Sequence, residues 1–193
     1  HFLYNTLDTI VWLAEAGQKE QVVSMVQTLS DFFRASLNSG KDIVSLEGEC
    51  RHITSYLQIQ QVRYQDILTY DVDIPEEIAN CKIPKITLQP LVENALYHGI
   101  KNKRGKGRIV VTGRREKDKC VIRVVDNGIG MTKERLNQVR GGLTTKIEDS
   151  NDFYGLYNVN ERIRLKFGEE YGLSIDSVLQ EGTCVEVWLP WES

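Results

Sequence analysis

The sequence is poor in cysteine, proline and methionine, and neither sign of charge is in large excess. Its 193 residues include 4 Cys, 4 Pro and 2 Met, and 24 Lys and Arg stand against 27 Asp and Glu, a net charge of −3. Without a positive excess there is no general attraction to nucleic acid or to an anionic membrane, so any phosphate binding must be local. The cysteines form no C-x-x-C pair, which argues against a zinc site or redox motif and fits a reducing, cytoplasmic compartment.

Long apolar runs are also missing. No stretch approaches the roughly 18 residues of a membrane helix, and we expect no signal peptide within these residues. The 41% hydrophobic and 26% charged residues are those of a globular protein, which excludes a disordered chain, collagen and a coiled-coil rod. Because the chain begins with His1 rather than Met, we expect it to be a fragment of a longer protein.

The first third of the chain has apolar residues at helical spacing. The pattern predicts a helix over residues 1–38, with a break near Gly17, a turn over 38–42, and a second helix from Ser45, its N-cap, to about Tyr64. Two long helices in sequence predict a hairpin. Its uncovered apolar faces could pack against a second copy in a four-helix dimer, or against the rest of this chain.

After about residue 66 short alternating strands replace the long helices. The pattern predicts helices over 84–99, from about 132, and over 155–167, and strands over 68–74, 108–114, 120–125, 173–178 and 184–189. We therefore predict an α+β fold in two domains, a helical domain over 1–66 and an α/β sandwich over 67–193, whose mixed or antiparallel sheet carries helices on one face.

The predicted helix over 84–99 carries two polar residues on one face. Asn94 and His98 are four residues apart, amid residues that look buried. An amide at this place can ligate Mg²⁺ or a phosphate-bound water. It can equally cap or pack a helix, and both interpretations stay open.

Glycines follow the predicted strands and helices at three further places. Asp126-x-Gly128-x-Gly130 comes directly after a strand, where backbone can approach a flat ligand and the carboxylate can accept a hydrogen bond from an amine, although Asp-Asn-Gly is also a common turn. Gly141, Gly142 and Gly155-Leu156 offer a mobile lid and a helix start that could hold phosphate. Gly182-Thr183 opens the last strand, as a ligand contact or as an ordinary hairpin turn.

In their order, Asn94, Asp126-x-Gly128-x-Gly130, Gly155-Leu156 and Gly182-Thr183 resemble the N, G1, G2 and G3 boxes of the GHKL superfamily. This is the Bergerat-type ATP-binding fold of gyrase, MutL, the heat-shock chaperone and histidine kinases. The opening segment His1-Phe2-Leu3-Tyr4-Asn5 resembles the phosphoacceptor segment of sensor histidine kinases of the LytS/YesM type. Segments such as Tyr56-Leu57-Gln58-Ile59-Gln60 extend that resemblance over nearly the whole chain.

The resemblance implies ATP and Mg²⁺ as cofactors and gives the boxes their roles. Asn94 would ligate Mg²⁺ between the phosphates, and Asp126 would accept a hydrogen bond from the adenine amine. Gly128 and Gly130 would shape the nucleotide wall and Thr183 would support the adenine. His98 could contact phosphate, and the lid over the triphosphate would be formed by Gly141, Gly142, Gly155 and Leu156.

The resemblance also implies protein-histidine kinase activity. His1 would be the nucleophile, because a neutral imidazole nitrogen can attack the γ-phosphorus in line. Glu93 could position a water or accept a proton, or be a solvated carboxylate, and Asn5 could serve dephosphorylation of the regulator. Pro90 stands where gyrase-type ATPases carry a catalytic glutamate, so we expect poor intrinsic hydrolysis of ATP.

The expected partners are a response regulator that receives the phosphoryl group on an aspartate and a second copy of the chain. No nucleic acid is expected, because the basic run over residues 101–108 lacks aromatic residues and contains glycines. The fragment would be cytoplasmic and the full-length protein anchored in the membrane. Two alternatives stay open: an ATP-binding regulatory module without catalysis, and an ATPase of the gyrase or MutL kind.

Overall fold

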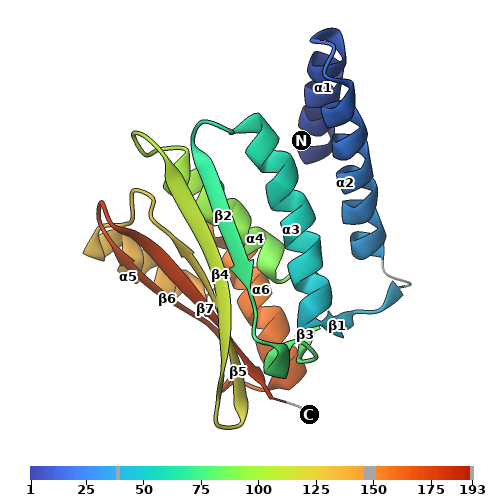
Figure 1. The fold of residues 1–193 in the computed structure, drawn as a ribbon. Coiled ribbons are helices and arrows are strands. Elements are labelled where there is room, and N and C mark those ends of the chain that lie inside the picture. Colours follow the sequence, from blue (N-terminus) through green and yellow to red (C-terminus); the bar gives the residue numbers. More distant parts are fainter. Residues whose placement is uncertain (38–39, 146–150, 192–193) are drawn as a thin grey trace.

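The computed structural model describes residues 1–37, 40–145 and 151–191, the side chains of 151–154 excepted. The chain opens with α1 (Phe2–Glu15) and α2 (Lys19–Leu37), two antiparallel neighbours (Figure 1). Gly17 lies between them with φ +71°, in the left-handed region that glycine enters without strain. The predicted break near Gly17 is confirmed, and the chain reverses there, so that the helical stretch over 1–38 forms two helices. Residues 38 and 39 of the predicted turn lie outside the described residues.

The third helix, α3 (Leu46–Arg63), begins at the predicted N-cap. The Ser45 hydroxyl accepts a hydrogen bond from the Gly48 amide at 3.2 Å, which satisfies one of the free amides at the helix start. α3 lies between the sheet and the pair α1–α2 (Figure 1), and one apolar core continues from it into the rest of the chain. The division into domains at residue 66 stays a prediction.

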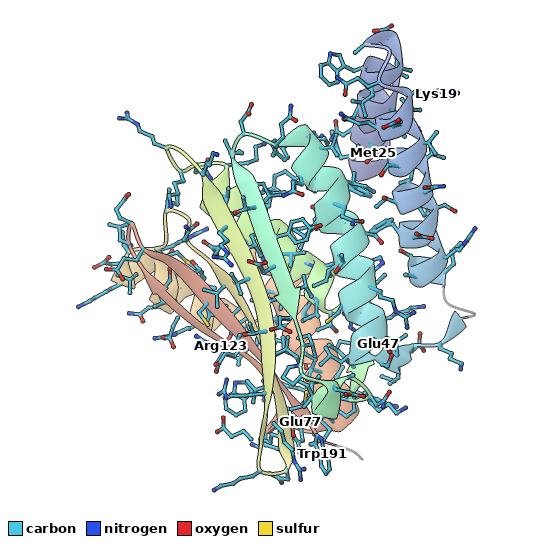
Figure 2. The ribbon with its side chains drawn as sticks, in the orientation of Figure 1. Lys19, Met25, Glu47, Glu77, Arg123 and Trp191 are labelled. Atoms are coloured by element: carbon cyan, nitrogen blue, oxygen red, sulfur yellow. The ribbon has the colours of Figure 1, made fainter. Side chains whose placement is uncertain are left out.

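A five-stranded mixed sheet forms the other half of the molecule. Its order is β2-β4-β5-β7-β6, with β2 parallel to β4 and every other pair antiparallel. Helices cover one face (Figure 1), and the other carries charged residues such as Arg123, paired with Glu186 at 3.3 Å (Figure 2). The predicted α+β fold is confirmed. The strands are β2 (Leu68–Asp73), β4 (Gly107–Glu116), β5 (Lys119–Asp126), β6 (Gly172–Val178) and β7 (Gly182–Pro190).

The segment before the first box differs from the prediction. A short sheet pairs β1 (Ile43–Ser45) with β3 (Lys82–Pro84), and a 3₁₀ turn, η2 (Glu76–Ile78), precedes β3. Three-residue strands are too short for alternation to reveal them. The helix expected from residue 84 begins later, as α4 (Leu88–Asn94), and continues into a π-helical turn, η3 (Ala95–Ile100).

Two more helices complete the layer. α5 (Lys133–Gly142) is capped by the Thr132 hydroxyl, which accepts from the Arg135 amide at 3.2 Å. α6 (Asn151–Phe167) begins before Gly155, where the sequence predicted its start. A glycine within a helix costs only about 1 kcal/mol, so Gly155 did not mark the boundary.

A small second core joins the N-terminal helices. Leu13 of α1, Met25 of α2 and Ile59 of α3 pack together and are buried. Met25 is labelled in Figure 2. Within the described ranges, none of the helices has the length and apolar character needed to cross a membrane.

Candidate active site

A cavity of about 390 Å³ lies between the α4–η3 segment, the inner face of the sheet, α5 and α6. Residues from segments far apart in the sequence meet on its wall. Of the predicted site residues, the cavity is lined by Asn94, His98, Asp126, Gly130, Leu156 and Thr183. The boxes that the sequence placed in order along the chain thus converge in space.

Asp126, the last residue of β5, provides a buried carboxylate at this cavity. Its Oδ1 accepts a hydrogen bond from the Gly128 amide at 2.8 Å. Burial raises the pKa of Asp126 to about 6, and the amides of Gly128 and Thr183 and the charge of Lys103 act in the opposite direction. A buried carboxylate with a raised pKa can accept a hydrogen bond from a donor group of a ligand.

The approach of backbone to this carboxylate requires glycine. A Cβ on Gly128 would lie 2.4 Å from the backbone C and Cα of Gly99, and one on Gly99 would lie 2.7 Å from Asp126 Oδ1. Gly130 has φ +62°, and a Cβ there would lie 1.9 Å from the Val178 carbonyl oxygen. The two glycines of the first glycine box are therefore needed for close packing and for backbone conformation.

Gly128→Ala is expected to lower the free energy of unfolding by about 1–3 kcal/mol, because backbone atoms cannot move aside as a side chain can. The matched control is Gly141→Ala, where a Cβ would meet nothing within 4 Å and alanine favours the helix. Denaturant titrations of both variants check this. Equal stability of the two variants would contradict the packing argument.

Asn94 and His98 face the cavity from the α4–η3 segment. Across the part of the chain that the structure describes, neither side chain forms a hydrogen bond with protein, so the Asn94 oxygen is free to bind a ligand. Among the same residues no group of three or more His, Cys, Asp or Glu could form a metal cage. The Asn94 amide oxygen can serve as one ligand of Mg²⁺, which proteins commonly bind through one or two oxygen ligands together with substrate phosphates.

Three polar residues of the wall were not predicted. Asn102, Thr132 and Arg135 line the cavity beside the boxes, and the rest of the wall is largely apolar. Arg135 is a cation at the α5 side of a site expected to hold phosphate. The sequence offered little indication that these three residues belong to the site, because each lies a few positions outside a glycine-rich segment.

Several predicted site residues do not line the cavity. Glu93 lies on another face of α4, where its Oε1 accepts from the Gln89 amide at 2.8 Å. Gly142 is buried at the end of α5, and Gly155 lies within α6. Part of the predicted lid, residues 146–150, lies outside the described residues. The role of each of these residues stays a prediction.

His1 and Asn5 also lie away from the cavity. His1 is exposed at the N-cap of α1, and the Asn5 amide donates to its carbonyl oxygen at 3.0 Å. Figure 1 shows α1 on the other side of α3 from the sheet. The proposed nucleophile and the cavity are thus separate in this arrangement.

Comparison with known proteins identifies the family. Residues 84–193 match the family described as "Histidine kinase-, DNA gyrase B-, and HSP90-like ATPase", an ATP-binding fold, and residues 1–68 match the family "Histidine kinase". The chain therefore belongs to the histidine kinase family, as its motifs predicted.

Individual relatives support this family assignment. Over 98% of its length the chain is 39% identical to the sensor histidine kinase YesM of Bacillus subtilis, and over all of it 34% identical to the sensor protein LytS of Staphylococcus saprophyticus. It spans 31% and 32% of these proteins, about a third of their length.

Solved structures share the fold. The catalytic domain of histidine kinase ThkA superposes with a TM-score of 0.57 at 10% identity, covering 77% of this chain and 95% of that domain. The histidine kinase domain of a blue-light activated kinase from Erythrobacter litoralis superposes with a TM-score of 0.56 at 14% identity, covering 90% and 82%. At such low identity these matches bear on the fold alone.

Proposed function

We propose that this chain is the catalytic part of a sensor histidine kinase, which transfers the γ-phosphoryl group of ATP to His1 and then to an aspartate of a response regulator. The observation that supports it best is the convergence of Asn94, Asp126, Gly130 and Thr183 on one cavity. These residues lie in the segment 84–193 that matches the ATPase family, and His1 lies in the segment 1–68 that matches the family "Histidine kinase".

The roles follow from the chemistry of each group. Asp126 accepts a hydrogen bond from the adenine amine, and Thr183 supports the same end of the ligand. Asn94 holds Mg²⁺, which offsets phosphate charge when bound. A neutral nitrogen of His1 attacks the γ-phosphorus, so that a P–N bond forms, the bond to the ADP oxygen breaks, and ADP leaves.

His1 must approach the cavity for this step. Because α1 lies beyond α3, the transfer requires movement of the helices, or a partner subunit that presents its own His1. Movement of this kind would give a sensor segment control over the kinase. We also propose that the full-length protein is anchored in the membrane by segments outside this chain.

A homodimer is the second part of the proposal. Apolar side chains on α1 are exposed at helical spacing, among them Leu7, Val11 and Trp12, and α2 adds Val26 and Leu37. A second copy could cover this face in a four-helix arrangement.

Val11→Glu is therefore expected to shift the protein from dimer to monomer, because it places a charge in the middle of the apolar face. Light scattering at several protein concentrations measures the mass. Gln27→Glu, which adds the same charge at an exposed polar position of α2, is the control. A protein that is monomeric before substitution would refute the proposed dimer.

The function itself is tested by incubation with γ-labelled ATP. We expect label on the protein that is labile in acid and stable in alkali, as phosphohistidine is, and no label when Mg²⁺ is chelated. Binding of ATP without labelling would favour the regulatory module, and steady release of phosphate without labelling would favour an ATPase.

A further inference from the structure

A stripe of buried polar residues runs along α3. Glu49, His52, Tyr56 and Gln60 follow one another at spacings of three, four and four residues, so they share one face of the helix. Each is at most 3% exposed. Four polar side chains in a row inside a core need partners, because an unpaired buried polar group costs free energy.

The partners lie on the α4–η3 segment and just before it. The Glu49 carboxylate accepts from the amides of Thr87 and Leu88 at 3.0 and 3.1 Å, at the start of α4. His52 Nε2 lies 2.7 Å from Gln89 Oε1, and Gln89 Nε2 donates to Glu93 Oε1 at 2.8 Å.

The same pairing continues into η3. Gln60 Nε2 donates to the hydroxyl oxygens of Tyr56 at 2.9 Å and of Tyr97 at 3.2 Å. The partners Gln89, Glu93 and Tyr97 are four residues apart and therefore lie on one side of their segment. We name these contacts between α3 and α4–η3 the polar seam; its members are Glu49, His52, Tyr56, Gln60, Gln89, Glu93 and Tyr97.

A neighbouring face of the same segment lines the cavity, because successive residues of a helix are about 100° apart. Asn94 immediately follows Glu93, and His98 immediately follows Tyr97. A rotation or shift of α4–η3 that breaks the seam would therefore also move both cavity residues. Because a hydrogen bond has a narrow range of distance and angle, the seam restricts the rotation and shift of the segment.

The seam also reaches the helix that begins beside His1. The His52 ring stacks on Phe32 of α2 with centroids 4.5 Å apart, and the Phe2 ring lies 4.9 Å from Phe32 and 5.0 Å from Tyr56. The residue that follows the proposed phosphoacceptor thus packs on two rings that touch or belong to the seam.

From this geometry we propose that Gln89 is a positioning residue: its hydrogen bonds to His52 and Glu93 fix α4–η3 so that Asn94 faces the phosphates of ATP. The inference rests on the proposed function, because it gives Asn94 the role of holding Mg²⁺ on those phosphates. Gln89 itself does not line the cavity.

Gln89→Leu tests this, since leucine keeps similar bulk and removes both hydrogen bonds. The affinity for ATP with Mg²⁺ is expected to fall about tenfold. The affinity for adenosine, which Asp126 binds, is expected to stay within about twofold, a split that a general loss of structure would not produce. Calorimetry measures both ligands, and Gln58→Leu, on the exposed face of α3, is the control.

Exchanging the side chains of residues 89 and 93 should restore the affinity for Mg²⁺-ATP. Gln89→Glu alone sets two carboxylates against each other and should weaken Mg²⁺-ATP binding at least as much as Gln89→Leu. Adding Glu93→Gln lets the new amide donate to the new carboxylate, which can still accept from His52, so Mg²⁺-ATP affinity should return to within about threefold of the original.

The outcomes separate the two proposals. Failure of the unsubstituted protein to bind Mg²⁺-ATP would overturn both. Normal Mg²⁺-ATP binding by Gln89→Leu, equal losses for ATP and adenosine, or no recovery in the exchanged pair would overturn the positioning role and leave the kinase proposal intact. If Gln89→Leu does not fold, the exchanged pair decides the question alone.

Discussion

His1→Gln is expected to abolish acid-labile labelling by γ-labelled ATP, a loss of at least about a thousandfold, because the substitution removes the nucleophile and nothing replaces it. ATP binding should be unchanged, since His1 does not line the cavity. The phosphoenzyme assay and calorimetry with an ATP analogue check the two halves of this result.

The chain has 3 histidines, so the other two must be considered as acceptors. His52 is 3% exposed and its Nε2 lies 2.7 Å from Gln89 Oε1, so it is a poor nucleophile toward ATP. His98 lines the cavity and is the rival acceptor. Label that persists in His1→Gln and disappears in His98→Gln would move the acceptor to η3 and contradict our assignment.

Tyr4→Ala is the matched control on α1. Tyr4 is 74% exposed and has no ring contact in the described structure, so its loss should leave labelling close to that of the unsubstituted protein. Loss of label in both variants would show that labelling depends on the structure of α1 and not on the imidazole of His1.

The sequence predicted the cavity better than it predicted the helices around it. Asp126, Gly128 and Gly130 come at the end of a strand, at a fixed spacing. Only glycine fits where backbone packs closely at this carboxylate. The sequence pattern therefore predicts the local structure. The reversal at Gly17 was predicted only as a break, because a single glycine does not say how far the chain turns.

Tertiary contacts explain what the sequence could not show. The start of α4 depends on the Glu49 carboxylate, 39 residues away from Leu88 in the chain. Periodicity reports which face of a helix is apolar, but not which distant side chain caps its start. Likewise the polar residues of α3 interrupt an apolar pattern. Their partners on the α4–η3 segment are distant in the sequence, so the pattern could not identify them.

Asp126→Asn is expected to change binding and stability in opposite directions. The affinity for ATP should fall about 10- to 100-fold, because the adenine amine loses a hydrogen bond to a charged acceptor. The fold should become more stable at neutral pH, because a neutral amide is cheaper to bury than a carboxylate and its oxygen can still accept from the Gly128 amide.

The pH dependence gives the sign and the size of this gain. The pKa of Asp126 is raised by burial from 3.8 to about 6, so between these values the folded state binds a proton that the unfolded state does not. The stability of the unsubstituted protein therefore falls, relative to the variant, as the pH rises from about 4 to about 6. Above that range the pH-dependent part of the gap should level off at about 2–3 kcal/mol, and below pH 4 this part should vanish.

Urea titrations of the two proteins across pH 4–8 measure the gap, and calorimetry at pH 7.5 measures ATP affinity. A variant that is less stable than the unsubstituted protein at pH 7.5, or a gap that widens toward acid, would refute the pKa argument. The expected combination has a clear physical meaning: the fold gives up stability to keep a charged acceptor in an apolar wall, and such a cost is typical of a site shaped for its ligand.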